Sequence, residues 1–330
     1  MIYLLYVIVA AGVVWLSIKA SQYVDLLDKK TKLSGAFIGG IMLSAVTSLP
    51  ELFTSLSSTV LLGKPELCIG NILGSNLFNI AILSILVIIS IKNFSKAKVA
   101  KGHYVVTFSV FAVYIAIILN KYNANIFGTT NIFNIDIFTF SITSIIIVIL
   151  YCFTVKKMSE ENGALPEQAV IKEEPSKTDC LTVKQIVIRF ILVSLGIVIL
   201  SIIITYITDI IAQRHNLGTG IAGAIFLGVA TSLPEVSSTI ALFKIKNYNI
   251  AIGNIVGSNI FNFLILAIVD LIYIGGSIYT FGDVQTLNLL IFGAIATPLL
   301  AVLFKTKNKI IKIMFSLGVI GCYLAFLLIK

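Results

Sequence analysis

The pentapeptide Thr-Ser-Leu-Pro-Glu occurs twice in this sequence, at Thr47–Glu51 and at Thr231–Glu235. Each copy ends in a glutamate in the middle of a long apolar segment that contains no Lys, Arg or His. Placing a charged side chain such as aspartate at bilayer depth costs at least ~2.5 kcal/mol on insertion scales, and such groups usually have a function. Glu51 and Glu235 are therefore predicted to form one buried cation-binding site.

A proline precedes each of these glutamates. Pro50 and Pro234 cannot donate a backbone hydrogen bond, and a proline ring crowds the preceding helical turn. We expect both prolines to break their helices and to loosen the carbonyl groups around Thr47 and Thr231. In lipid such carbonyl groups need a partner inside the protein. A desolvated cation can be that partner.

A second repeated motif carries amides and hydroxyls. It reads Gly-Asn-Ile-Leu-Gly-Ser-Asn-Leu-Phe-Asn from Gly70 and Gly-Asn-Ile-Val-Gly-Ser-Asn-Ile-Phe-Asn from Gly253. In each copy three polar residues recur every fourth position and share one helical face. They are Asn71, Ser75 and Asn79 in the first copy and Asn254, Ser258 and Asn262 in the second. The Gly-x-x-x-Gly spacing predicts close helix packing. Asn76 and Asn259 point elsewhere and are predicted to cap or cross-link helices.

All of these candidate ligands are oxygen atoms. Hard cations such as Ca²⁺ and Na⁺ prefer oxygen, whereas Zn²⁺ and Cu⁺ favour nitrogen or sulfur ligands. The two histidines fall at predicted helix ends, and the four cysteines form no C-x-x-C pair, so we interpret the cysteines as packing residues. Two carboxylates would neutralise one Ca²⁺. An intramembrane protease is disfavoured because both acids are glutamates among cation-type ligands, so we expect neither an enzyme nor a cofactor.

The composition requires a membrane to position these residues. Of the 330 residues 58% are apolar and 12% are charged, with a mean hydropathy of +1.03. About 20 apolar residues span a bilayer as a helix, and the long runs do not alternate as β-barrel strands would. The sequence predicts an all-α polytopic protein with ten transmembrane helices. Their ranges are 2–18, 35–62, 67–91, 103–120, 137–155, 186–211, 218–243, 248–274, 287–304 and 310–329.

The positive charges segregate between the two sides of this topology. Loops on the N-terminal side carry 4 of the 24 Lys and Arg residues, and loops on the other side carry 20. Because positive loops stay in the cytoplasm, we predict a plasma-membrane protein with both termini outside. The expected partners are Ca²⁺, Na⁺ and the lipid bilayer. The net charge of +9 arises from these positively charged loops, so we expect no nucleic-acid partner. We also expect the chain to act as a monomer.

The two motif copies indicate an internal repeat. Residues 35–84 align with residues 219–268 at a shift of 184 and then 183 positions. We predict two repeats of five helices, 1–155 and 186–330, joined by a cytoplasmic linker at 156–185. An odd number of helices gives the two repeats opposite orientations, an arrangement typical of secondary transporters with a site at the repeat interface.

At these motifs the sequence resembles the cation/Ca²⁺ exchanger superfamily, and within it the prokaryotic-type sodium/calcium exchangers. The resemblance implies that Glu51 and Glu235 bind Ca²⁺, together with backbone carbonyls of Thr47 and Thr231. It further implies Na⁺ sites at the serines of the motifs and a central lining of asparagines. The serines are Ser48, Ser75, Ser232 and Ser258, and the asparagines are Asn79 and Asn262.

The chain departs from the family pattern at a few positions. Asn262 stands where relatives often carry Asp, which argues against K⁺ dependence, and Val46 and Ala230 stand where many relatives have Gly. The expected activity is alternating-access exchange of Na⁺ for Ca²⁺, electrogenic and K⁺-independent. A Ca²⁺/H⁺ antiporter on the same fold is the main alternative, and a channel is a further one.

Overall fold

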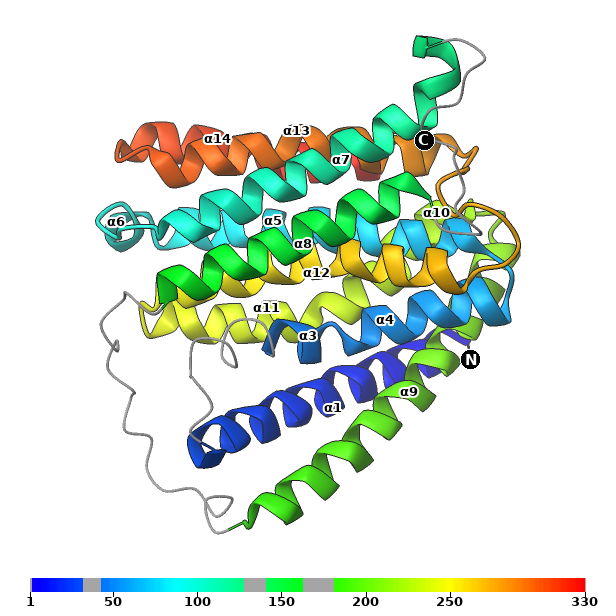
Figure 1. Cartoon of the computed structure of the whole chain (residues 1–330), viewed down its shortest axis with the longest axis horizontal. Coiled ribbons are helices and arrows are strands. Elements are labelled where there is room, and N and C mark those ends of the chain that lie inside the picture. Colours follow the sequence, from blue (N-terminus) through cyan, green and yellow to red (C-terminus); the bar gives the residue numbers. More distant parts are fainter. Residues whose placement is uncertain (1, 32–42, 128–140, 163–180, 330) are drawn as a thin grey trace.

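The computed structural model describes residues 2–31, 43–127, 141–162 and 181–329, and within these ranges the regular structure is entirely helical (Figure 1). Two segments, labelled η, are π-helical. The elements are α1 Ile2–Thr31, α3 Leu43–Thr47, α4 Leu49–Leu56, η2 Ser57–Leu61, α5 Pro65–Ile89, α6 Ile91–Phe94, α7 Lys101–Phe127, α8 Ile142–Asn162, α9 Val183–Arg214, α10 Thr219–Ala222, η3 Gly223–Gly228, α11 Val229–Lys244, α12 Tyr248–Ile272, α13 Val284–Lys305 and α14 Lys309–Leu328.

These helices confirm the all-α polytopic fold, and they are consistent with the ten predicted spans. Eight helical stretches in the described residues are long and apolar enough to cross a bilayer. The two other predicted spans, 35–62 and 137–155, begin outside the described residues, and their described parts are helical. The buried share of the apolar window is 67% for α5 and 72% for α12, against 22% for α1 and 17% for α9. The helices with the Gly-Asn motifs therefore form the centre.

Several helices extend beyond the predicted membrane spans. The first span was expected to end at residue 18, but α1 continues to Thr31 through the lysine-rich segment. Both ends of the predicted linker 156–185 are helical, because α8 extends to Asn162 and α9 begins at Val183 behind a Thr182 capping box. Helix propensity does not stop at the bilayer surface, and Lys, Ala and Leu favour helix on either side of it.

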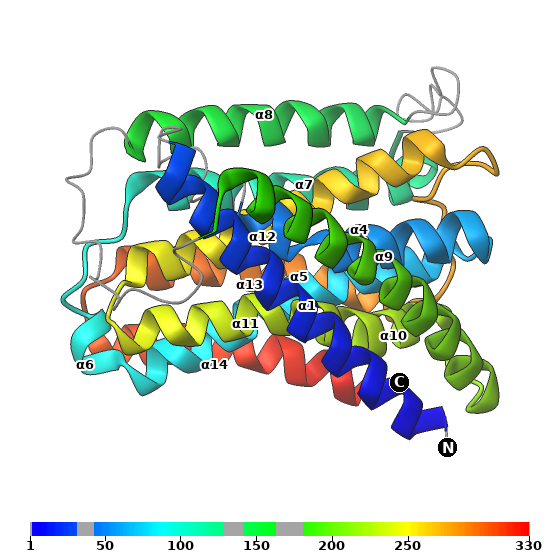
Figure 2. The same ribbon diagram turned by 90° about the horizontal axis from the view of Figure 1, so that it is seen from below.

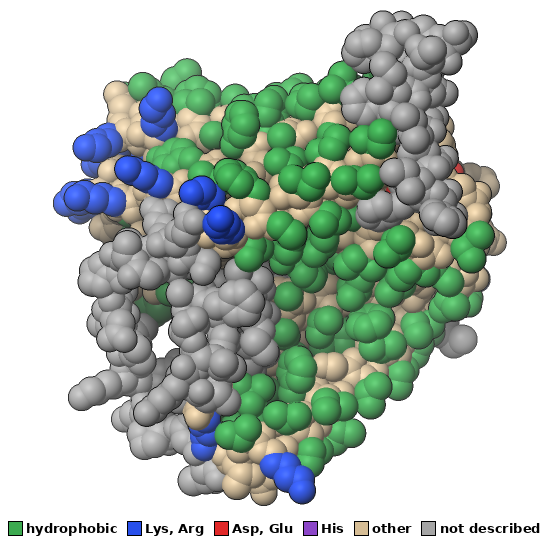
Figure 3. All heavy atoms as spheres, viewed as in Figure 1, with side chains coloured by type: hydrophobic (Ala, Val, Ile, Leu, Met, Phe, Trp, Pro, Cys, Tyr) green, Lys and Arg blue, Asp and Glu red, His purple; other side chains and the backbone are tan. Residues whose placement is uncertain are grey.

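The helices run between two chemically different ends. In Figure 1 both termini lie at the same end of the molecule, and α5 and α12 run antiparallel through its centre. The Lys and Arg side chains visible in Figure 3 gather toward the opposite end, and hydrophobic side chains are prominent on the visible face between the two ends. Figure 2 shows α1 and α9 crossing the other helices obliquely. This charge segregation matches the asymmetry predicted from the sequence.

The glycines of α5 allow the halves to pack closely, as the Gly-x-x-x-Gly spacing predicts. A Cβ atom on Gly70 would lie 2.1 Å from the Gly220 carbonyl oxygen, and one on Gly74 would lie 2.4 Å from the Ala224 Cα. Gly253 on α12 instead faces a side chain. A Cβ atom added there would lie 3.1 Å from Cε1 of His103. Gly70 and Gly74 of α5 thus pack directly against the backbone of α10 and η3.

Substituting Gly74 with alanine is expected to lower the melting temperature of the purified protein. The added methyl group meets backbone rather than a flexible side chain, so the helices must separate, at a cost of about 3 kcal/mol. Gly321→Ala is the matched control, because a Cβ there meets nothing within 4 Å. Thermal unfolding in detergent measures both variants, and equal melting temperatures would contradict the tight packing.

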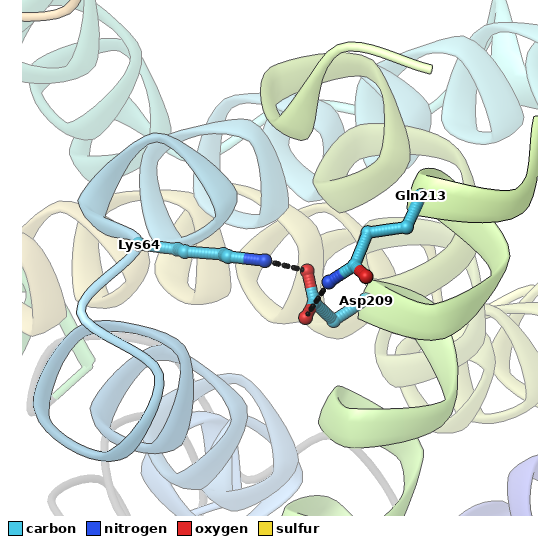
Figure 4. Close-up of polar contacts among 3 residues, drawn as sticks. All are labelled: Lys64, Asp209 and Gln213. Atoms are coloured by element: carbon cyan, nitrogen blue, oxygen red, sulfur yellow. Dashed lines mark hydrogen bonds and ion pairs between the residues drawn. The ribbon is translucent and has the colours of Figure 1, made fainter. Parts of the chain in front are cut away.

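At the end that carries the termini, an ion pair connects α9 to the segment preceding α5. Lys64 pairs with Asp209, and the Gln213 side chain donates to the other Asp209 carboxylate oxygen at 2.8 Å (Figure 4). The two charged side chains are 29% and 11% exposed. Asp209 lies in the last two turns of α9, and the residue as a whole is 8% exposed.

Breaking this ion pair on one side is expected to destabilise the protein. Exposed pairs contribute about 0–1 kcal/mol, and loss of one partner of a buried pair costs about 3–5 kcal/mol. For this half-buried pair we expect about 2 kcal/mol for Asp209→Asn. The double variant with Lys64→Met leaves no unpaired charge and should recover part of the melting temperature. A double variant less stable than the single one would argue against the pair.

Asp270 is a second buried acid near a helix end. It lies close to the end of α12 and is 0% exposed. Its carboxylate accepts hydrogen bonds from the Ser141 backbone N–H at 3.0 Å and the Ser144 hydroxyl at 2.7 Å, at the start of α8. A carboxylate is favourable at a helix N-terminus, where backbone N–H groups lack partners. Asp270 therefore holds α8 against α12.

Candidate cation-binding site

The two glutamates lie on different helices, one in each repeat. The carboxylate of each glutamate contacts the other repeat. Glu51 is in the first turn of α4 and Glu235 is inside α11, and both are 0% exposed. The Ser48 hydroxyl donates to Glu235 Oε1 at 3.3 Å, and the Ser232 hydroxyl donates to Glu51 Oε1 at 3.4 Å. Each pentapeptide thus holds the carboxylate of the other across more than 180 residues of sequence.

The backbone differs between the two copies. Ser48 separates α3 from α4, with φ −88° and ψ 12°, so the first helix is interrupted two residues before Pro50. The prediction for Pro234 is wrong, because α11 continues through it from Val229 to Lys244. A membrane helix tolerates a proline where neighbouring helices, Ser or Thr side chains, or local π-helical turns satisfy the freed backbone groups. Here the irregular turn lies earlier, in the π-helical segment η3, and such segments are frequent at functional sites.

The predicted threonines lie beside the glutamates. Thr47 and Thr231 are 1% and 0% exposed, and each precedes the serine that crosses to the opposite carboxylate. The Thr231 hydroxyl donates to the Leu227 carbonyl at 2.9 Å and approaches Asn71 Oδ1 at 3.4 Å. The Thr231 hydroxyl therefore contacts both its own helical segment and Asn71 of α5. The structure brings together both threonines and both serines of the pentapeptides.

Two asparagines attach the glutamate-bearing turns to the central helices. The Asn71 amide donates to Thr54 Oγ1 at 2.9 Å and Ser55 Oγ at 3.1 Å and approaches the Glu51 carbonyl at 3.5 Å. The Asn254 amide makes the equivalent bonds in the second half, to Thr239 Oγ1 at 3.0 Å, Ser238 Oγ at 3.1 Å and the Glu235 carbonyl at 3.2 Å. The two copies of the repeated motif therefore make matching contacts, each with the glutamate-bearing turn of its own half.

The sequence placed Asn71 and Asn254 on the polar face, among the candidate oxygen ligands, but the family resemblance assigned them no role. The missed signal was the hydroxyl pair in the turn after each glutamate, Thr54-Ser55 and Ser238-Thr239. Such a pair recurring one turn after a buried acid offers acceptors to an amide on the next helix. These asparagines fix each glutamate-bearing turn against its neighbour.

The remaining predicted ligands lie on α5 and α12. Ser75 and Ser258 are both 0% exposed, but only Ser75 has a partner, the Gly228 carbonyl at 3.1 Å. Asn79 and Asn262 are also 0% exposed, and each donates its amide to an asparagine of the other half. The two serines, predicted to be equivalent, thus differ in this structure.

Several buried oxygen atoms in this region have no hydrogen-bond partner among the described residues. They are Glu51 Oε2, Glu235 Oε2, Asn79 Oδ1, Asn262 Oδ1, Asn254 Oδ1 and Ser258 Oγ. An unsatisfied buried polar atom costs about 1–3 kcal/mol, so such a concentration indicates a ligand. Two carboxylates with neutral oxygens suit Na⁺ or Ca²⁺. The described residues contain no group of three or more His, Cys, Asp or Glu placed for a metal ion.

Comparison with known families gives a match along nearly the whole chain. The family model described as sodium/calcium exchanger protein matches residues 3–164 and 185–330. The inner membrane protein YrbG of Escherichia coli (strain K12) is 24% identical over 241 residues, 69% of this chain. The match spans 66% of that relative, slightly less than two thirds of its length. The uncharacterized membrane protein MJ0091 of Methanocaldococcus jannaschii is 25% identical over 72% of this chain and 70% of its own.

Solved structures share the fold. The H⁺/Ca²⁺ exchanger CAX superposes with a TM-score of 0.72 at 13% sequence identity, covering 99% of this chain and 87% of that one. The sodium-calcium exchanger NCX_Mj, soaked with Na⁺ and Sr²⁺, superposes with a TM-score of 0.60 at 19% identity over the full length of both chains. At these identities the likeness establishes the architecture, and it includes exchangers with different coupling ions.

Proposed function

Because the chain belongs to the sodium/calcium exchanger protein family, we propose that it is a secondary active antiporter that exchanges Na⁺ for Ca²⁺. The observation that carries this proposal is the pair of fully buried carboxylates of Glu51 and Glu235, each held by a serine of the opposite repeat. Their combined charge of −2 neutralises one Ca²⁺, and the surrounding neutral oxygens suit Na⁺ when Ca²⁺ has left.

The proposed ligand set follows the repeat. Glu51 and Glu235 bind Ca²⁺ with the carbonyls of Thr47 and Thr231, and the amide oxygens of Asn79 and Asn262 line the centre. Ser48, Ser75, Ser232 and Ser258 contribute to flanking Na⁺ sites. The burial of all these residues supports this proposal, as do the unpartnered oxygens at the glutamates, at both central asparagines and at Ser258.

Transport then requires the site to open alternately to the two sides. We assign the moving part to α1 and α9, which pack against one another obliquely to the other helices (Figure 2) and bury the smallest share of their apolar windows. Such a pair can slide along the glutamate-bearing helices without disrupting α5 and α12. The repeats 1–155 and 186–330 supply equivalent halves, one for each open state.

The same reasoning orients the protein in the membrane. The protein lies in the plasma membrane in this proposal. The lysine-rich ends of its helices face the cytoplasm, and both termini lie outside. A single chain contains both glutamates, so a monomer has the complete site. Asn at position 262 leaves two carboxylates at the site, which favours exchange without K⁺.

The coupling ion is tested with the purified protein in liposomes. Uptake of ⁴⁵Ca²⁺ is measured under an outward gradient of Na⁺, H⁺ or K⁺ in turn. We expect uptake with the Na⁺ gradient alone, and vesicles without protein give the leak rate. Uptake driven by a pH gradient in the absence of Na⁺ would refute Na⁺ coupling and support a Ca²⁺/H⁺ antiporter. A rate that never saturates with Ca²⁺ and shows no counterflow would indicate a channel.

A further inference from the structure

Asn76 and Asn259 form a symmetric cross-link at the centre of the molecule. The Asn76 side-chain amide donates to the Asn259 backbone carbonyl at 3.2 Å, and the Asn259 amide donates to the Asn76 carbonyl at 3.0 Å. Both residues are buried, at 0% and 2% exposure. The sequence predicted a helix cross-link here, and the structure confirms it between α5 and α12.

The same two side chains also contact the central asparagines. Asn76 Oδ1 accepts from the Asn262 amide at 2.9 Å, and Asn259 Oδ1 accepts from the Asn79 amide at 3.1 Å. Four asparagines, two from each half, therefore form one hydrogen-bonded cluster, the asparagine quartet Asn76, Asn79, Asn259 and Asn262.

The chemistry of amides fixes every orientation in this quartet. A backbone carbonyl can only accept, so the NH₂ groups of Asn76 and Asn259 must face the two backbone carbonyls. Their Oδ1 atoms then face Asn262 and Asn79, which can respond only by donating their own NH₂ groups. The remaining polar atoms, Asn79 Oδ1 and Asn262 Oδ1, point away from the quartet, and both are buried without a partner.

We infer that Asn76 and Asn259 are positioning residues that make Asn262 and Asn79 present oxygen, rather than NH₂, to the transported cation. The inference rests on the proposed function and extends it to two residues outside the ligand set. A freely rotating amide presents its NH₂ group as readily as its oxygen, and an NH₂ group repels a cation. The quartet fixes the orientation of both central amides before the ion binds. The amides of Asn79 and Asn262 therefore need no reorientation on binding.

The quartet also explains why this chain carries asparagine at position 262. A carboxylate there has no N–H to donate, and one of its oxygens would face Asn76 Oδ1. Two acceptors in contact repel, and Asn76 could turn to donate only by abandoning the Asn259 carbonyl. Asn76 and Asn262 are therefore a matched acceptor and donor, and Asn262→Asp does more than add one charge.

The test compares substitutions of similar size inside and outside the quartet. Asn76→Leu and Asn259→Leu remove the acceptors that hold Asn262 and Asn79. We expect the KM for Ca²⁺ to rise about five- to tenfold, the factor that corresponds to one lost hydrogen bond, with a smaller change in the maximal rate. Asn120→Leu is the matched control, because it also loses an inter-helix bond, to Thr143 Oγ1 at 2.8 Å, but lies outside the site. Its KM should equal that of the unmodified protein.

A second measurement separates positioning from general stability. Asn262→Asp is made alone and together with Asn76→Leu, and the loss of uptake is compared in the two backgrounds. Positioning predicts that the aspartate costs less when Asn76 Oδ1 is absent, so the two changes are not additive. Asn76→Ser replaces the leucine variant if that variant does not fold.

Each outcome is distinct. Additive effects, or a KM in the Asn76 variants equal to that of Asn120→Leu, would overturn the positioning role and leave the proposed exchange intact. An unmodified protein that takes up no Ca²⁺ under any gradient refutes the proposed function itself, and the positioning role with it.

Discussion

Substitution of Glu51 or Glu235 with glutamine is expected to abolish Ca²⁺ uptake in liposomes, with a loss of at least about a hundredfold. Each change removes one of the two negative charges that compensate Ca²⁺ in a fully buried site. The complex then carries a net positive charge out of contact with water, and an uncompensated buried charge costs about 3–5 kcal/mol. Since 1.4 kcal/mol is a factor of ten, the bound state becomes almost unpopulated.

The same substitution elsewhere provides the control. Glu66→Gln changes a half-buried glutamate in the first turn of α5, outside the ligand set, and should transport Ca²⁺ at the unmodified rate. Glutamine has nearly the shape of glutamate and still accepts from Ser232 or Ser48, so melting temperatures should remain close to that of the unmodified protein. Unmodified uptake rates in a folded Glu51→Gln or Glu235→Gln protein would exclude this site.

Membrane potential is expected to change Ca²⁺ accumulation about a hundredfold over about 120 mV. With a site charge of −2, Ca²⁺ gives a neutral loaded carrier, while three Na⁺ give a charge of +1. One turnover therefore moves one net charge, which corresponds to ≈ 2.3 kcal/mol per 100 mV. About 60 mV then shifts the equilibrium Ca²⁺ ratio tenfold.

The sign of the effect follows from the direction of exchange. In Na⁺-loaded vesicles three Na⁺ leave for each Ca²⁺ that enters, so net positive charge leaves the vesicle. An inside-positive potential should increase Ca²⁺ uptake, and an inside-negative potential should decrease it. Potassium gradients with valinomycin set the potential, and vesicles without valinomycin are the control. Uptake that does not respond to the clamped potential would contradict the assigned charge balance.

Local patterns in the sequence were sufficient for the architecture. Hydropathy gave the ten helical segments, and the counts of Lys and Arg gave the charged end that Figure 3 shows. Glu51 and Glu235 could be identified as a pair because each is an isolated acid within its apolar segment. These features depend on neighbouring residues and on the solvent around each helix. They can therefore be predicted without knowing how the helices pack against one another.

Tertiary packing decided how these groups pair. Asp270 has no acceptor or donor pattern around it in the sequence that marks it as a structural residue, and only the packing of α8 brings Ser141 and Ser144 to its carboxylate. Pro234 was predicted to break its helix, yet α11 runs through it from Val229 to Lys244. In a membrane helix, neighbouring helices and local π-helical turns can satisfy the backbone groups that a proline leaves free. Helical periodicity tells which residues share a face, but it does not tell which face of which helix lies opposite.

The repeated pentapeptide shows this division most clearly. The sequence determined that two glutamates, two serines and two prolines stand at equivalent positions of two halves. Only the tertiary structure decided that Ser48 binds Glu235 and Ser232 binds Glu51, and that Asn76 and Asn259 orient the central amides. The physical reason is that helix formation and membrane burial depend on short stretches of chain. A hydrogen bond between residues some 180 positions apart exists only once the two halves have packed.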